Sequence, residues 1–221
     1  MIPPEQDAAF VAAMEDVLKV YERPYDPLYP VVCMDEASRQ LIEETRAPFT
    51  DSHGVTHSDF EYIRHGQQNI FLATEPLGKW RTAKVTDRRT AIDWAHFMKE
   101  AVIERYPDAT KIVLVMDNLN IHKMASFYEA YPPELARACV ERLEVHHTPK
   151  HGSWLDMAET ELSALQNQCL GKRRIPTKEQ LTAEVKAWKT ARNKSQTGVN
   201  WQYTTSDART KLKRLYPVIE K

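Results

Sequence analysis

Two short, fully apolar runs stand out in the hydrophobic pattern, and both are predicted to be strands buried in the middle of a sheet. They are residues 31–34 (VVCM) and 112–116 (IVLVM). Runs of this length are too short for a helix, and their apolar side chains on both faces are typical of a strand covered on both sides. Residues 143–147 (LEVHH) are a third short strand of the same kind. Polar residues follow each run and are expected to end the strand.

A different pattern, in which apolar and polar residues alternate, occupies the segment after the first buried strand. Residues 59–65, 69–75 and 80–86 read as antiparallel strands, with a turn that begins at Gly66. Alternation with period two places one face on a core and the other toward water. The first buried strand is therefore expected to be followed by a loop over 43–58 and then by an antiparallel meander.

Helical spacing of apolar residues accounts for most of the remaining chain. Helices are predicted, in order, over 4–22, 90–105, 124–143 (interrupted by Pro132 and Pro133), 156–170, 177–193 and 206–215. Strands that alternate with helices in this way predict an α/β fold, a mixed sheet with helices on both faces.

Three regions are expected from this order of elements. Residues 1–30 form an N-terminal helix and a proline-rich linker, because Pro24, Pro27 and Pro30 prevent regular structure. Residues 31–170 form the α/β core, and residues 171–221 form a basic helical extension of it.

Acidic residues occupy the positions where the two buried strands emerge. Asp35 and Glu36 follow the first strand, and Asp117 follows the second. In an open sheet, ligands bind in the crevice at the carboxyl ends of the strands. Carboxylates on such a rigid support suit magnesium or manganese, which prefer oxygen ligands. The alternative is that either aspartate simply caps a turn or the next helix.

The helix over 156–170 supplies three further acidic candidates. Asp156 and Glu159 are three positions apart and share a face, whereas Glu161 lies about 200° around the axis from Glu159. The pattern therefore favours Glu159 and leaves Asp156 and Glu161 as alternatives. Glu161 is expected to face solvent, so that replacing it with alanine would leave a metal-dependent activity largely intact.

Composition changes this picture in one respect, the distribution of charge. The net charge is −1, yet residues 171–221 contain 13 Lys and Arg against 4 Asp and Glu. A polyanion-binding face at this end is one interpretation, and a solvated basic helix is the other. Three widely spaced cysteines in apolar segments favour reduced thiols and a cytoplasmic protein. No glycine-rich phosphate loop, zinc motif, secretory signal or membrane-length apolar run is present.

Several ordered motifs resemble one known family. MDE at 34–36, VMDNLNIH at 115–122 and HHTPKHGSWLDMAETELSALQNQCL at 146–170 are similar to the catalytic core of DDE transposases. The similarity is greatest to the bacterial insertion-sequence branch of the Tc/mariner superfamily. It continues through 132–134, 169–176 and 201–217, and so covers almost the whole chain.

The resemblance implies an RNase H-like fold whose catalytic and metal-binding carboxylates are Asp35, Asp117 and Glu159. It also implies two Mg²⁺ or Mn²⁺ ions per site and an enzyme that cleaves and joins DNA strands. The partners it implies are double-stranded DNA, at transposon ends and target, and a second copy of the chain in the DNA complex. A bacterial protein of this kind is expected in the cytoplasm, associated with the nucleoid.

Two departures from the family pattern are visible. The family usually has asparagine where this chain has Asp156, which could join the metal ligands or repel the substrate phosphate. Members of the group also usually carry an N-terminal helix-turn-helix region, and none is recognisable here. The chain is therefore expected to be a catalytic domain without that region. The alternatives are an inactive or partial transposase that binds DNA or assists assembly, and another RNase H-like nuclease.

Further residues are candidates for supporting roles around this site. Glu36, Asn118, Asn120, His122 and Asp156 are candidates for orienting the metal ligands or the substrate. Trp154 could stack on an unpaired base, although a buried tryptophan that anchors the loop is favoured. The candidate DNA contacts, which position phosphates without reading sequence, are Lys150, His151, Trp154, Lys172, Arg173, Arg174, Arg209, Lys211, Lys213 and Arg214.

Overall fold

A five-stranded mixed sheet forms the centre of the computed structural model, which describes residues 5–47, 49–57, 60–171 and 173–218. The strand order is β5-β4-β1-β6-β7. β6 runs parallel to β1, and β7 runs parallel to β6. On the other side, β4 runs antiparallel to β1, and β5 runs antiparallel to β4. The strands are β1 (Val31–Glu44), β4 (Tyr62–Glu75), β5 (Trp80–Thr86), β6 (Ile112–Met116) and β7 (Leu143–His147).

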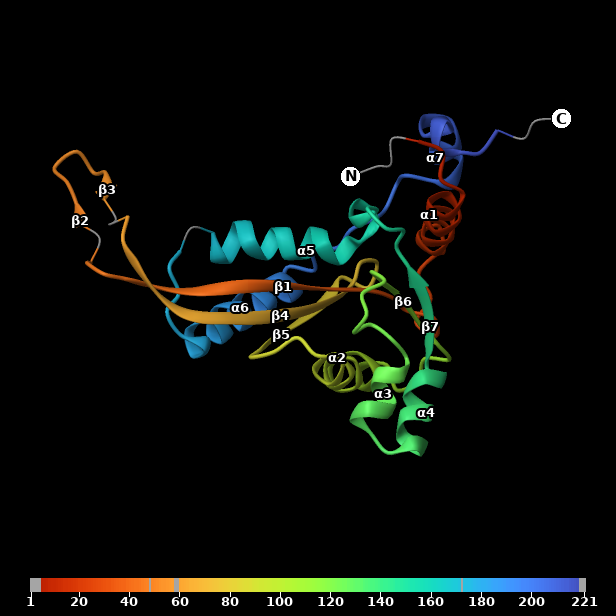
Figure 1. Ribbon diagram of the computed structural model, residues 1–221, viewed down its shortest axis with the longest axis horizontal. Helices are drawn as coiled ribbons and strands as arrows, with labels where there is room; N and C mark the ends of the chain where they lie inside the picture. Colours follow the sequence, from red (N-terminus) through yellow and green to blue (C-terminus); the bar gives the residue numbers. More distant parts are fainter. Residues whose placement is uncertain (1–4, 48, 58–59, 172, 219–221) are drawn as a thin grey trace.

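β1 and β4 differ from the prediction because they form one long antiparallel ribbon (Figure 1). β1 does not end at Asp35 but continues to Glu44, paired with β4 along its length. The two strands predicted on either side of Gly66 are one strand. Gly66 has a φ of 87° at a shift in register, so it forms a β-bulge rather than a turn. Beyond the ribbon, a small hairpin of β2 (Phe49–Thr50) and β3 (Thr56–His57) lies within the predicted loop.

Helices cover both faces of the sheet, as predicted. One face packs against α2 (Ala91–Phe97) and the turns that extend it to Arg105, and against α3 (Ala125–Ala130) and α4 (Pro133–Glu141). The other face packs against α1 (Ala8–Tyr21), α5 (Met157–Leu165), α6 (Lys178–Lys194) and α7 (Thr205–Lys211). α5 is preceded by the turn Ser153–Leu155 and extended by a π-helical turn, Gln166–Leu170, and Lys213–Leu215 form a turn after α7. No helix in the described ranges is long and apolar enough to cross a membrane.

The N-terminal helix α1 is part of the main core. Phe10, Met14 and Leu18 are buried in the same apolar cluster as α5, α6 and α7. The Tyr21 hydroxyl at the end of α1 donates a hydrogen bond of 2.6 Å to the carbonyl oxygen of Leu155, just before α5. α1 therefore fixes the start of the helix that carries the acidic residues. Figure 1 shows α7 beside α1, far from the end of α5 at which the chain leaves for α6.

Candidate active site

The parallel pairing of β1 and β6 brings the first two predicted ligands together. Met34 pairs with Met116, so the residues that follow them, Asp35 and Asp117, occupy neighbouring positions on adjacent strands. Asp35 lies within β1, whereas Asp117 is the first residue after β6. The backbone N–H of Leu119 donates to the Asp117 carboxylate at 3.3 Å. Asp117 therefore also begins a turn directly after the second apolar run.

The start of α5 places two more carboxylates at the same point. Glu159 lies in the first turn and is exposed, and Asp156 is the N-cap. Burial raises the pKa of Asp35 to about 7, and the neighbouring Glu36, Asp117 and Glu159 add to the rise. Asp117 and Glu159 are thus each close enough to Asp35 to repel its carboxylate. A bound cation would relieve this repulsion.

Asp156 is the residue that departs from the family pattern, and its geometry explains why aspartate is accepted. One carboxylate oxygen accepts a hydrogen bond of 2.8 Å from the N–H of Ala158, which caps α5. Asparagine and aspartate serve equally well as N-caps. The other oxygen is buried without a partner in the described chain. Burial, and then Asp35, raise the pKa of Asp156 well above its usual range, so the neutral form is favoured when no cation is bound.

Changing Asp156 to asparagine should therefore stabilise the metal-free protein and leave a metal-dependent activity intact. The cap is retained, while a buried carboxyl group that faces other carboxylates is removed. We expect the free energy of unfolding to rise by about 1 kcal/mol, measured by urea denaturation in EDTA. If that activity falls sharply and more magnesium is needed, then Asp156 is itself a metal ligand.

His122 links Asp117 to a second buried carboxylate. Its Nδ1 lies 2.6 Å from the Asp117 carboxylate, and its Nε2 lies 2.9 Å from the Glu36 carboxylate. Burial alone would lower the pKa of His122, but these two carboxylates outweigh burial and raise it to about 9. The ring is therefore cationic at neutral pH. Arg89 forms a further ion pair of 3.2 Å with Glu36. The predicted supporting roles of Glu36 and His122 thus have a concrete geometry, in which they hold Asp117 in place.

Alanine in place of His122 should weaken the use of metal more than it weakens the fold. Asp117 would lose the contact that orients it, and such losses typically cost 10- to 100-fold in activity or metal affinity. We expect the magnesium concentration for half-maximal activity to rise by about that factor. His65→Ala is the matched control, because His65 pairs with Glu43 on the exposed part of the β1–β4 ribbon. An unchanged magnesium requirement would show that His122 has only a structural role.

The acidic cluster fits a divalent cation in its chemistry. It offers hard oxygen ligands, it is partly buried, and one oxygen of Asp156 lacks any partner within the described residues. Among these residues, no three His, Cys, Asp or Glu side chains are already grouped tightly enough to hold an ion. The ligands would therefore have to draw together around a bound ion.

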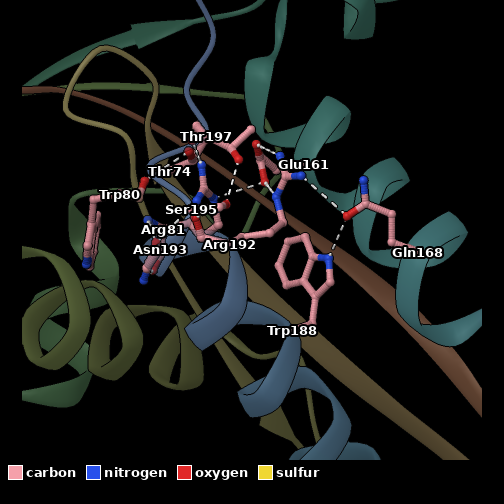
Figure 2. A network of polar contacts seen from close by, with 10 residues as sticks. All are labelled: Thr74, Trp80, Arg81, Glu161, Gln168, Trp188, Arg192, Asn193, Ser195 and Thr197. Atoms are coloured by element: carbon pink, nitrogen blue, oxygen red, sulfur yellow. Dashed lines mark hydrogen bonds and ion pairs between the residues drawn. The ribbon is translucent and has the colours of Figure 1, made fainter.

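The burial of Glu161 shows that the expectation of a solvent-facing side chain was wrong. Its side chain is only 2% exposed and lies between two arginines, as Figure 2 shows. Arg81 of β5 is 3.1 Å away and is itself 1% exposed, and Arg192 of α6 is 2.8 Å away. The helix pattern placed Glu161 correctly on the side away from Glu159. That side faces β5 and α6 instead of water, which the pattern could not show.

Of the predicted DNA contacts, those nearest the carboxylates lie in the loop before α5. Lys150 and His151 are exposed and line a groove of about 1360 Å³ that also includes Asp117, Asn118 and α1. His151 has a φ of 65°, and a Cβ at the next residue, Gly152, would lie 2.5 Å from Pro149. The loop is therefore held in a tight, specific conformation. Asn120 is exposed in the neighbouring loop.

Trp154 is partly buried and packs against the core, so the favoured interpretation of a buried loop anchor holds in part. Its ring lies 6.3 Å from Trp201 and 5.8 Å from Tyr203, measured between ring centroids. The segment after α6 thus anchors the loop, and base stacking by Trp154 gains no support from this packing.

The basic C-terminal residues do not gather into one patch. Most have carboxylate partners: Arg173 pairs with Glu184, Arg174 with Glu44, Arg209 with Glu15 and Lys211 with Asp207. Lys213 and Arg214 are exposed, and Lys172 lies outside the described residues. Arg173 and Arg174 follow the far end of α5, whereas Arg209 and Lys211 lie on α7 beside α1. DNA contacts by these residues remain a prediction, and they would have to be at two separate places.

The sheet order and the acidic cluster where β1, β6 and α5 meet define the class of RNase H-like enzymes with a carboxylate active site. Residues 30–182 match the family model described as the DDE superfamily endonuclease. The chain therefore belongs to this family of endonucleases. No curated protein matches it in sequence.

Solved structures with the same fold are complexes and domains of Mos1 transposase. The Mos1 paired-end complex with the left transposon end has a TM-score of 0.58 at 14% identity over 86% of this chain. The Mos1 strand transfer complex gives 0.58 at 15% identity over the same share. In both, this chain spans 57% of the Mos1 chain. The catalytic domain of Mos1 mariner transposase gives 0.54 at 14% identity and covers 86% of both chains. The predicted RNase H-like fold is confirmed.

Proposed function

We propose that this chain is the catalytic domain of a DDE transposase, which cleaves DNA strands and joins them to target DNA in a metal-dependent reaction. The observation that carries the proposal is the cluster of Asp35, Asp117, Asp156 and Glu159, in which burial and the neighbouring carboxylates raise the pKa of Asp35 and of Asp156. A partly buried group of carboxylates that repel one another is costly to fold unless a cation joins it.

Asp35, Asp117 and Glu159 would hold two Mg²⁺ or Mn²⁺ ions. When bound, such ions supply activation of a water or DNA 3′-hydroxyl as nucleophile and stabilisation of the leaving oxygen. The residues of the chain do the rest. The ion pairs of His122 hold Asp117 in one orientation. Lys150 and His151, which line the same groove as Asp117, would bind the phosphates that flank the cleaved bond.

The related structures support the proposed cofactor and partner. Mos1 paired-end complexes with Mg and with Mn share the fold, with TM-scores of 0.55 and 0.53. By analogy, we propose that this chain binds double-stranded DNA at transposon ends and target and acts there as a homodimer. The bacterial insertion-sequence branch remains part of the proposal, on the strength of the motifs at 34–36, 115–122 and 146–170.

A nicking assay with defined DNA tests the proposal. The chain should nick supercoiled or end-containing duplex DNA in magnesium or manganese, should be inactive in EDTA, and should join a pre-cut 3′-end to target DNA. Binding without nicking would identify a non-catalytic assembly module. Preferential cleavage of the RNA strand in an RNA–DNA hybrid would identify a different RNase H-like nuclease.

A further inference from the structure

A groove leads away from the carboxylates between β1 and α5, and none of the predicted DNA contacts in the described chain lines it. It has a volume of about 770 Å³, and its lining includes Asp35 and Glu159 at one end and Arg39 and Gln166 at the other. A second groove of about 730 Å³ shares Ser38 and Arg39 with the first and continues to Arg173 and Arg174. Arg39 therefore lies where the two grooves meet.

The lining residues lie along one face of β1 and one face of the helix opposite. Asp35 and Arg39 are four residues apart on β1 and face the same side of the sheet, about 13 Å apart at roughly 3.3 Å per residue. Glu159, Ser163 and Gln166 follow one exposed face of the helix opposite, over about 10 Å. A chain lying in this groove would pass from the acidic cluster to the guanidinium of Arg39.

Arg39 carries a positive charge that no carboxylate neutralises among the described residues. Its guanidinium contacts neutral oxygens: the Gln166 side chain at 3.3 Å and the carbonyls of Arg173 at 2.8 Å and Gly171 at 3.4 Å. Its Nε is buried without a hydrogen-bond partner in the described part of the chain. Arg173 and Arg174, by contrast, each pair with a glutamate.

The contacts of Arg39 hold its guanidinium rigidly at the end of α5, yet they leave Nη1 with one N–H unused. A cation that is fixed in position, partly desolvated and not paired with a carboxylate is well suited to bind an anion. A DNA strand supplies phosphates at a regular spacing. A B-form strand rises roughly 3.4 Å per nucleotide along the helix axis, and its backbone path is longer, so the reach of about 13 Å from the cluster corresponds to at most about four nucleotides.

We infer that the groove between β1 and α5 binds the backbone of one DNA strand, and that Arg39 holds a phosphate within about four nucleotides of the one bound at the carboxylates. This inference rests on the proposed function, because it takes DNA as the substrate. It adds a binding track and a residue that the sequence motifs do not indicate. Arg39 acts as a positioning residue, since it lies too far from the carboxylates to touch the reacting atoms.

Replacing Arg39 with glutamine should lower the affinity for a short DNA duplex about tenfold, the loss expected for one charge-assisted contact. The slope of log affinity against log salt should decrease by about one unit. Arg39→Lys should keep most of the affinity, because the charge is retained. The matched control is Arg137→Gln, which removes an exposed arginine on α4 that pairs with Glu141. Binding is measured by fluorescence anisotropy with the full chain.

A second measurement separates phosphate binding from loosening of the α5 end. Uncharged methylphosphonates are placed singly at each of the five phosphates on either side of the cleavage point. In the wild-type protein one of them should lower affinity about tenfold, and in Arg39→Gln the same substitution should have no further effect. If no position depends on Arg39 while the wild type still nicks DNA, the inference is overturned and the proposed function stands. If the wild type shows Arg39-dependent binding but no nicking, the proposed function fails instead.

Discussion

Alanine in place of Asp35, Asp117 or Glu159 should each reduce metal-dependent DNA nicking by about a thousandfold or more. The three carboxylates come from β1, the end of β6 and the first turn of α5, and Asp117 and Glu159 both lie near enough to Asp35 to raise its pKa. Because the proposed reaction depends on ions held by all three, loss of any one removes the charge that activates the nucleophile or stabilises the leaving oxygen. Plasmid nicking in magnesium and in manganese measures the effect.

The fold of these variants should survive, and this distinguishes lost chemistry from lost structure. Removing Asp35 or Glu159 relieves the other carboxylates, so these two metal-free variants should unfold at wild-type urea concentrations or higher. Asp117→Ala also loses the ion pair with buried His122 and should unfold at a somewhat lower urea concentration. Magnesium should raise the melting temperature of the wild type, because it binds only the folded state, and should do so much less in the variants. Glu129→Ala, at an exposed position of α3, is the matched control. Full nicking activity in Glu159→Ala would contradict the assignment of this residue.

The elements that the sequence predicted well are those in which local pattern and environment agree. The run at 112–116 is apolar because β6 is covered on both faces, and all five of its residues are buried. The helix interrupted at Pro132 is two helices, α3 and α4, on either side of that proline. The position of Asp117 directly after β6 followed from the same pattern and was confirmed.

β1 shows where local pattern is insufficient. After Met34 the sequence becomes polar, which normally ends a buried strand, yet β1 runs ten residues further to Glu44. Its pairing with β4, and not its hydrophobicity, sustains it there. This extension matters for the site, because it places Arg39 on the same face as Asp35. A strand that ended at Glu36 would give no reason to connect the two residues.

α5 shows a second limit of local pattern, which is that it cannot identify the residues that pack against each face of a helix. Periodicity correctly separated the faces of Glu159 and Glu161, but it could not say that Arg81 and Arg192, 80 and 31 residues away, approach the second face. A buried glutamate and an exposed one have the same local signature. The N-cap role of Asp156 was also hidden, because aspartate fits both a metal ligand and a cap.

Removing the Glu161 carboxylate should destabilise the fold more than any substitution in the acidic cluster. Glu161→Ala would leave Arg81, which is 1% exposed, without its ion-pair partner, and would remove the link from α5 to α6 through Arg192. Breaking a buried ion pair on one side typically costs about 3–5 kcal/mol, a large part of the stability of a domain. We expect the urea midpoint to fall accordingly, with an unchanged dependence on denaturant concentration.

The control for this loss is a glutamate in an exposed pair on the same helix as Arg192. Glu184 pairs with Arg173, and the two side chains are 34% and 53% exposed. Glu184→Ala should therefore cost less than about 1 kcal/mol. A Glu161→Ala variant within about 1 kcal/mol of the wild type would show that Arg81 finds water or another partner. If the variant is destabilised but still nicks DNA at low temperature, then Glu161 supports the fold and not the chemistry, which is the role that its position on the side of α5 away from Glu159 implies.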